Sequence, residues 1–256
     1  MSAPVTDGPP SSGPPLVTVV LPAYRAAAIL DRHVPLLQDH LRSRGVPHEV
    51  IVVDDGSQDD GQTEAVARRL GCRYIGLPRN SGKGAAVRCG MIAATGRYRI
   101  YTDADVPFAL DTFDSVLRYL DFKEFDVVAG DRTLTGSVYF TEVPLVRRIG
   151  SAVCSTLVGR FLAGGWFDTQ CGIKGFRDEV ASDLFSVSRV NRFAFDVELL
   201  YVALKRNYDI KRIPVRLRSN DTSSVRLLND GVRFALDLVR IRWNQFLGRY
   251  QRVTVR

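Results

Sequence analysis

The sequence predicts an α/β fold in which a central, mostly parallel sheet carries helices on both faces. Short runs of apolar, often β-branched residues alternate with helical patterns along the chain, as in parallel strands that are buried on both sides. Two of these runs end in acidic pairs, Asp54 with Asp55 and Asp103 with Asp105. Because parallel sheets bind ligands at the carboxyl ends of their strands, the sequence predicts a site where these pairs meet.

The hydrophobic pattern predicts the elements in order. Apolar runs predict strands at residues 16–21, 49–53, 73–77, 98–102 and 126–130. Helical patterns predict helices at residues 26–44, 62–70, 84–94 and 111–120. Pro22 stops the first strand, and Gly45 with Pro47 ends the first helix. The small residues of the third helix allow it to pack close to the sheet.

Length and composition fit one globular domain, preceded by a disordered tail and followed by an amphipathic helix. The 256 residues, 45% hydrophobic and 25% charged, are enough for a full core. Residues 1–15, rich in Pro, Gly and Ser, predict a disordered tail; residues 16–226 form the predicted domain, and residues 227–256 a C-terminal amphipathic basic helix. The four cysteines lack CxxC spacing, which favours reduced thiols in a cytosolic setting. No segment approaches the ~20 apolar residues of a spanning helix.

The positive charge indicates an anionic partner. The net charge is +7 and the pI about 9.4, which suits a phosphorylated substrate, an anionic membrane or a nucleic acid. A nucleic-acid-binding module is disfavoured, because aromatic residues do not alternate with the positive charges and no helix-turn-helix or zinc signature is present. We therefore expect no nucleic acid among the partners.

The segment from Thr102 to Asp105 carries the clearest chemical signal. Side chains in a strand alternate between its faces, so Asp103 and Asp105 point the same way. Such a pair can hold a hard divalent cation and leave coordination positions open for phosphate oxygens. The alternative is a pair of turn aspartates, and the second acidic strand end at Asp54 favours a site for a nucleotide diphosphate.

A glycine-rich loop at residues 78–86 places Lys83 at the start of a helix. Backbone amides and an ammonium group in this arrangement can approach a phosphate. The loop lacks the spacing of a Walker motif, and no GxGxxG follows the first strand, which disfavours a dinucleotide oxidoreductase. An ordinary helix-capping turn is an equal alternative.

Four motifs occur in the order seen in inverting family 2 glycosyltransferases of the GT-A fold, which this chain resembles. They are LPAY at 21–24, VDDGS at 53–57, NSGKG at 80–84 and TDAD at 102–105. DTQCGIKGF at 168–176 and RFAFDVELL at 192–200 resemble segments of dolichyl-phosphate glucosyltransferases. The resemblance implies transfer of a single sugar, glucose from UDP-glucose, to a polyprenyl phosphate. Transfer from GDP-mannose and a soluble acceptor are the alternatives.

By this resemblance, the donor site divides into a nucleoside part and a diphosphate part. Pro22, Ala23 and Tyr24 would line the base and ribose pocket, with Asp54 accepting from the base, Asp55 nearby and Lys83 reaching the donor. Asp103 and Asp105 would frame the diphosphate and its metal, Mg²⁺ or Mn²⁺. Two departures from the family pattern stand out: Arg25 and Ala26 replace expected polar and acidic residues, and Pro107 stands where some relatives have a ligating Gln.

The acceptor side needs cations, because a polyprenyl phosphate is already anionic. The resemblance assigns Arg132, Arg147 and Arg148 to the acceptor phosphate. The candidate catalytic residues are Asp105, Asp168 and Asp196. Residues two apart on a helix do not share a face, so only one of Asp196 and Glu198 is expected in the site; we favour Asp196 and expect a structural ion pair for the other, with Arg192 or Arg189.

Two stretches indicate contact with a membrane surface. One is residues 143–166, and the other is the C-terminal helix. Apolar residues recur there at helical spacing: Val232, Ala235, Leu236, Val239, Trp243, Phe246, Leu247 and Tyr250. The arginines at 233, 240, 242 and 249 flank them. We expect a peripheral protein at the cytoplasmic face of a membrane; a helix packed on the core or in a homo-oligomer interface is the alternative.

Overall fold

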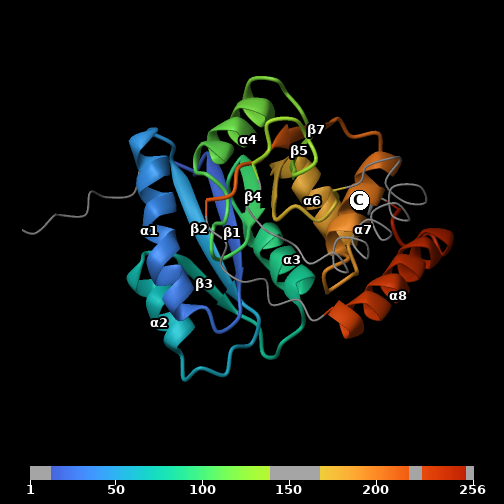
Figure 1. The fold of residues 1–256 in the computed structure, drawn as a ribbon, viewed down its shortest axis with the longest axis horizontal. Coiled ribbons are helices and arrows are strands. Elements are labelled where there is room, and N and C mark those ends of the chain that lie inside the picture. Colours follow the sequence, from blue (N-terminus) through green and yellow to red (C-terminus); the bar gives the residue numbers. More distant parts are fainter. Residues whose placement is uncertain (1–12, 139–167, 219–226, 252–256) are drawn as a thin grey trace, which may run out of the picture.

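The computed structural model describes residues 13–138, 168–218 and 227–251, with side chains from 233 onward in the last range. The described chain folds into a seven-stranded sheet of order β3-β2-β1-β4-β6-β5-β7 (Figure 1). Its strands are β1 (Val17–Ala23), β2 (His48–Asp54), β3 (Arg73–Gly76), β4 (Tyr98–Thr102), β5 (Val127–Asp131), β6 (Ile173–Arg177) and β7 (Ile210–Pro214). Arg147 and Arg148, the stretch 143–166 and most of the predicted tail lie outside the described residues.

Helices cover both faces of the sheet, as predicted (Figure 1). They are α1 (Ala27–Ser43), α2 (Gln62–Arg69), α3 (Lys83–Ala93), α4 (Asp111–Asp121), α6 (Asp178–Val187), α7 (Phe195–Lys205) and α8 (Leu227–Phe246). Alternate strand residues enter two core clusters: Val20 and Val53 face α3, α6 and α7, whereas Val19 and Val52 face α1, α2 and α4. No helix of the described part of the chain is long and apolar enough to cross a bilayer.

The nine elements predicted between residues 16 and 130 are all present, with ends within two residues of the expected ones. Strand β1 continues through Pro22 to Ala23, so the prediction that Pro22 stops it is wrong. Helix α8 ends at Phe246, ten residues before the predicted end of the C-terminal helix. The mostly parallel sheet is confirmed, but β6 runs antiparallel to both its neighbours, β4 and β5. The pattern did not predict β6, because Lys174 and Gly175 interrupt its short apolar run. The reversal matters for the site, since β6 begins at the edge of the sheet where β4 and β5 end.

Helix α3 lies against β1 and β2 because Gly90 has no side chain. A Cβ at this position would collide with the side chain of Val20 and lie 2.8 Å from Cγ2 of Val53. This close approach brings the first turn of α3, with Lys83, to the carboxyl edge of the sheet.

Replacing Gly90→Ala tests this packing. Helix propensity alone favours alanine by about 1 kcal/mol. Overpacking against Val20 and Val53 costs about 1–3 kcal/mol, so we expect a net loss in the free energy of unfolding, measured by urea titration. Ile92→Ala, on the exposed side of the same helix, is the control and should change stability by less than about 0.5 kcal/mol. A more stable Gly90→Ala protein would contradict the close packing.

Candidate active site

Charged residues gather at the carboxyl edge of the sheet because the reversed strand β6 starts there. In the register, Thr102 at the end of β4 pairs with Ile173 at the start of β6, and Ala129 of β5 pairs with Lys174. The loop before β6 therefore lies beside the residues that follow β4 and β5. This arrangement brings Asp103 and Arg132 to the same edge as Asp168.

Asp103 and Lys83 form an ion pair at this edge. Strand β4 ends at Thr102, and the Val106 amide donates to the Asp103 carbonyl at 2.9 Å, so Asp103 and Asp105 lie in a turn and the expectation that strand alternation aligns them is wrong. Lys83 Nζ lies 2.5 Å from Asp103 Oδ1, and the two side chains are 21% and 38% exposed, so the pair is accessible to a ligand. Burial alone would lower the pKa of Lys83, but the charges of Asp103, Asp196 and Asp105 outweigh it and raise the pKa. Lys83 thus stays cationic among three carboxylates. Gly172 lies beside them, and a Cβ there would come within 2.4 Å of Asp103 Oδ2, so a side chain at this position would displace that carboxylate.

A fully buried lysine lies beneath the site. Lys174 Nζ donates to Asp196 Oδ1 at 2.6 Å and to the carbonyl oxygen of Cys171 at 2.9 Å. The hydroxyl of Tyr101 donates to the same carboxylate oxygen. Burial and the charge of Asp196 raise the pKa of Tyr101 well above its usual value, so the phenol stays a donor. Asp196 also lies in the first turn of α7, where the helix dipole stabilises a carboxylate.

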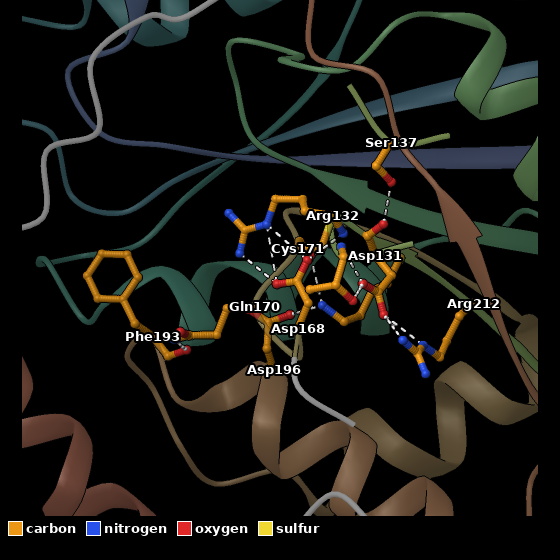
Figure 2. A network of polar contacts seen from close by, with 11 residues as sticks. Asp131, Arg132, Ser137, Asp168, Gln170, Cys171, Phe193, Asp196 and Arg212 are labelled. Carbon is orange, nitrogen blue, oxygen red and sulfur yellow. Dashed lines mark hydrogen bonds and ion pairs between the residues drawn. The ribbon is translucent and has the colours of Figure 1, made fainter. Parts of the chain in front are cut away.

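Arg132 and Asp168 form a bidentate pair, seen at the centre of Figure 2. Asp168 Oδ2 accepts from the backbone amide of Arg132 at 2.6 Å and from its Nε at 3.0 Å, and Oδ1 accepts from Nη2 at 2.7 Å. Burial would raise the pKa of Asp168, but the hydrogen bonds and charge of Arg132 prevail and lower it. The arginine is therefore fixed in orientation while 36% of its side chain is exposed.

The residue before Arg132 secures the same turn. Asp131 is fully buried, and its Oδ1 accepts from the backbone amide of Thr133 at 2.8 Å. Its Oδ2 accepts from Nε of Arg212, on β7, at 2.7 Å (Figure 2). The end of β5 is thus tied to the neighbouring strand, which limits the movement of Arg132.

The acidic pair at the end of β2 organises loops. Asp54 accepts from the Ser57 amide at 3.0 Å and from the Tyr74 hydroxyl at 2.9 Å. Asp55 accepts from the amides of Ser81 and Gly82 at 2.6 and 2.8 Å. The glycine-rich loop therefore directs these two amides at a protein carboxylate, and the approach of the loop and Lys83 to a phosphate stays a prediction.

The end of β1 borders this acidic pair. The Ala23 carbonyl accepts from the Asp55 amide at 2.8 Å, which fixes the chain where β1 and β2 end. Pro22 is partly buried, and the ring of Tyr24 is 46% exposed with the guanidinium of Arg25 over it. An exposed aromatic ring at this edge suits stacking on a base.

Asp196 and Glu198 have separate environments, as their spacing predicts. Glu198 Oε2 accepts from the backbone amides of Arg189 and Val190, each at 2.8 Å, and Oε1 accepts from the Tyr250 hydroxyl at 2.6 Å. Burial raises the pKa of Glu198, against these hydrogen bonds. Its structural role thus uses backbone amides and a hydroxyl in place of the expected ion pair.

A cavity of about 270 Å³ opens beside Lys83. It is lined by residues 80–83, residues 192–194, and Arg233, Phe234 and Asp237 of α8. Three of these residues, Lys83, Arg192 and Arg233, carry positive charge. The chemistry of the lining suits an anion.

The residues that support the site from below were not predicted from the sequence. Lys174 and Tyr101 hold Asp196, and Arg212 holds Asp131. A lysine inside an apolar run was the available signal for Lys174, since an unpaired charge is not buried in a core. Arg212 carried no such signal, because arginine is common in exposed strands.

We expect Asp168→Asn to lower the free energy of unfolding by about 2 kcal/mol at neutral pH, because the charged pair is lost while Arg132 can still reach water. The folded pKa of Asp168 is lowered, so its contribution is complete above the unfolded pKa of about 4 and disappears as the pH falls through the folded value. Urea titrations should therefore give converging stabilities of the two proteins below about pH 4. Asp39→Asn, in an exposed pair with Arg42, is the control. A constant difference at all pH values would contradict the ion pair.

Comparisons with known proteins agree with this geometry. Residues 18–185 match the model of the family Glycosyl transferase family 2. The chain is 30% identical over 246 residues to the dolichyl-phosphate beta-glucosyltransferase of Dictyostelium discoideum, covering 91% of this chain and 75% of that protein. It is 32% identical over 248 residues to the enzyme of that name in Drosophila melanogaster, covering 90% and 75%.

Solved structures confirm the predicted GT-A fold. Glucosyl-3-phosphoglycerate synthase from Mycobacterium tuberculosis, in complex with Mn²⁺, UDP and glucosyl-3-phosphoglycerate, superposes with a TM-score of 0.65 at 19% identity, covering 89% of this chain and 80% of that one. Mannosyl-3-phosphoglycerate synthase from Rubrobacter xylanophilus gives a TM-score of 0.64 at 19% identity, covering 94% and 77%. The family match over residues 18–185, together with the two relatives, shows that this chain is a member of glycosyl transferase family 2.

Proposed function

We propose that this protein transfers one glucose from UDP-glucose to a polyprenyl phosphate, with inversion at the anomeric carbon. The observation that carries the proposal is the fixed Arg132, held by Asp168 at the same sheet edge as the acidic pair of Asp103 and Asp105. Arg132 suits an anionic acceptor, and the pair of Asp103 and Asp105 suits a metal-bound diphosphate. The similarity to dolichyl-phosphate beta-glucosyltransferases along nine-tenths of the chain supports the same substrates.

Asp103 and Asp105 are the residues that would hold the donor's divalent metal. Carboxylate oxygens are the ligands that Mg²⁺ and Mn²⁺ prefer, and Gly172 leaves the room beside Asp103 that a bound group needs. Within the described ranges no group of three or more acidic, His or Cys side chains is arranged so that it could hold a metal ion by itself, and diphosphate oxygens would complete the coordination. When bound, the metal would neutralise negative charge on the leaving UDP. Lys83 lies beside Asp103 and adds a further positive charge for the diphosphate.

The acceptor needs positioning and no general base. Its phosphate is ionised near neutral pH, so a phosphate oxygen can attack the anomeric carbon directly. The new carbon–oxygen bond forms on the face opposite the bond between the anomeric carbon and UDP. That bond breaks, and UDP leaves with both of its electrons. Arg132 matches a phosphate through its planar guanidinium, and Asp168 holds that plane in place before the substrate arrives. Arg147 and Arg148 remain proposed acceptor ligands.

Asp196 supports the site from within the core. Its carboxylate is 4% exposed and is held by Lys174 and Tyr101, so we assign it a positioning role toward Lys83, whose charge it influences. Asp105 and Asp168 remain the proposed acidic residues beside the reacting sugar. Asp54, Asp55 and the residues Pro22, Ala23 and Tyr24 form the proposed nucleoside end of the site.

A lipid-linked acceptor requires contact with a membrane, and we place the protein at its cytoplasmic face. Burial raises the pKa of the Cys72 and Cys171 thiols to about 12 and keeps both unreactive. The homo-oligomer expected as a possible partner state remains a proposal.

The reaction is tested by nucleotide release from UDP- and GDP-sugars with Mg²⁺ or Mn²⁺, with and without a short polyprenyl phosphate. Release from UDP-glucose that depends on the lipid is the expected result. Lipid-dependent release from GDP-mannose would identify a mannosyltransferase. Nucleotide release that does not depend on the lipid would point to a soluble acceptor. Either this result or lipid-dependent release from GDP-mannose would overturn the proposal.

Asp103→Asn and Asp105→Asn should each lower kcat by about 100-fold or more, because removing a charge from the diphosphate site weakens transition-state stabilisation. Asp114→Asn is the control: its carboxylate pairs with His40 and Arg44 away from the site, so activity should be unchanged. Binding of Mn²⁺, followed by electron paramagnetic resonance in the presence of UDP, should weaken in the two site variants alone. Full activity of the Asp103→Asn or the Asp105→Asn protein would show that the substituted residue is not a metal ligand.

Arg132→Gln should raise the KM for the polyprenyl phosphate about tenfold or more, since a charge-assisted bond to phosphate is worth about 1.5–3 kcal/mol. The KM for UDP-glucose should change little, because Arg132 faces the acceptor. Steady-state kinetics with each substrate varied in turn separates the two constants. Arg118→Gln, on α4, provides a matched loss of charge. An equal rise in both KM values would indicate a general structural effect.

A further inference from the structure

Helix α8 carries apolar side chains on two opposite faces. Phe234, Leu238 and Ile241 face inward and pack against the core cluster that contains α7. A second set is exposed, and we call it the outer stripe: Leu236, Val239, Trp243 and Phe246 are 63%, 67%, 58% and 80% exposed. With 3.6 residues per turn, the outer stripe lies about half a turn around the helix from Ile241. A helix that is apolar on both sides is normally covered on both sides.

The inner face is fixed, so α8 cannot rotate to bury the outer stripe. The Tyr250 hydroxyl, just after the helix, donates to Glu198 of α7 at 2.6 Å in the core. Arg206 Nη2 donates to the Tyr250 carbonyl at 3.0 Å, and Asn244 is 1% exposed. Rotation of α8 would break these buried hydrogen bonds and would expose Phe234, Leu238 and Ile241 in exchange for the outer stripe, so it would bring no net gain. The inner contacts therefore fix the orientation of α8 and leave the outer stripe exposed.

Arginines border the outer stripe on both sides. By helical position, Arg233 and Arg240 lie along one side and Arg242 along the other. Asp237 is turned toward the inner side, where it lines the cavity beside Lys83. Within α8, Arg240 and Arg242 follow Asp237 and no acidic residue does. The outside of this part of α8 is thus both apolar and cationic.

This combination fits an anionic lipid surface better than a second copy of the chain. A two-fold dimer would place the same patch on both sides, so arginine would face arginine without a carboxylate between them. In a lipid headgroup layer, the apolar stripe enters the acyl boundary and the arginines reach up to phosphates. The stacked rings of Trp243 and Phe246, with centroids 5.7 Å apart, suit that interface.

We propose that the outer stripe of α8 and its bordering arginines dock this protein on an anionic lipid bilayer. The inference rests on the proposed function, because it places the acceptor and the enzyme on the same surface. Arg233, Phe234 and Asp237 of the same helix line the cavity beside Lys83. Docking through α8 therefore places the lipid surface on one side of this helix and the cavity on the other, about one helix diameter away.

The test uses the full chain with the double substitution Trp243→Gln and Phe246→Gln. Sedimentation with vesicles of phosphatidylcholine and phosphatidylglycerol measures the partition coefficient, which should fall at least about tenfold in the variant. Phe122→Gln removes an equally exposed ring, 79% exposed and next to α4, and should bind like the unaltered protein. Circular dichroism checks that all three proteins keep the same fold.

A second variant tests the charges. Arg240→Gln with Arg242→Gln should weaken binding to anionic vesicles by about fivefold per arginine and leave binding to pure phosphatidylcholine unchanged. Vesicle binding is measured without any sugar transfer. The proposed docking surface and the proposed transfer reaction are therefore tested independently. The Trp243 and Phe246 variant should also retain transfer to a water-soluble, short-chain polyprenyl phosphate.

Two results would overturn the inference. One is equal vesicle binding by the unaltered protein and the Trp243 and Phe246 variant. The other is a dimer of the unaltered protein, detected by light scattering, that becomes monomeric in the variant while neither binds vesicles. The second result would assign the outer stripe to an interface between copies of this chain.

Discussion

The buried ammonium group of Lys174 constrains the rest of the candidate site. A lysine with no exposed surface needs a fixed counter-charge, because an uncompensated buried charge costs several kcal/mol. Asp196 on α7 supplies that charge, and the Cys171 carbonyl oxygen accepts a second hydrogen bond from the same ammonium group. The pair therefore fastens β6 to α7 and sets where the loop before β6 meets the carboxyl edge of the sheet.

Two further cation–carboxylate pairs lie at that edge, and both are partly exposed. Lys83 with Asp103 suits the donor side, and Arg132 with Asp168 suits the acceptor side. In each, the cation is held before any substrate is present, which reduces the reorganisation needed when anions bind. The proposed reaction joins two anionic substrates, so fixed cations on both sides are its main electrostatic requirement.

Helix α8 connects this edge to the surface of the molecule. Glu198, two residues after Asp196 on α7, anchors α8 through Tyr250 and also holds the backbone at Arg189 and Val190. Helix α7 thus contacts the site through Asp196 and contacts the end of α8 through Glu198. The Tyr250–Glu198 hydrogen bond thus fixes the orientation of the outer stripe relative to α7, which also carries Asp196.

The sequence by itself determined the strands and helices from Val17 to Asp131 and the acidic strand ends at Asp54 and Asp103, because hydrophobic period and turn residues are local signals. It also placed Asp196 and Glu198 in different surroundings, since helical spacing separates them. Only the tertiary structure decided that Asp55 binds the amides of the glycine-rich loop, that β6 runs in reverse, and that Arg132 pairs with Asp168. It also decided which apolar side of α8 meets the core. These outcomes depend on which segments become neighbours in space, and neither composition nor spacing along the chain encodes that choice.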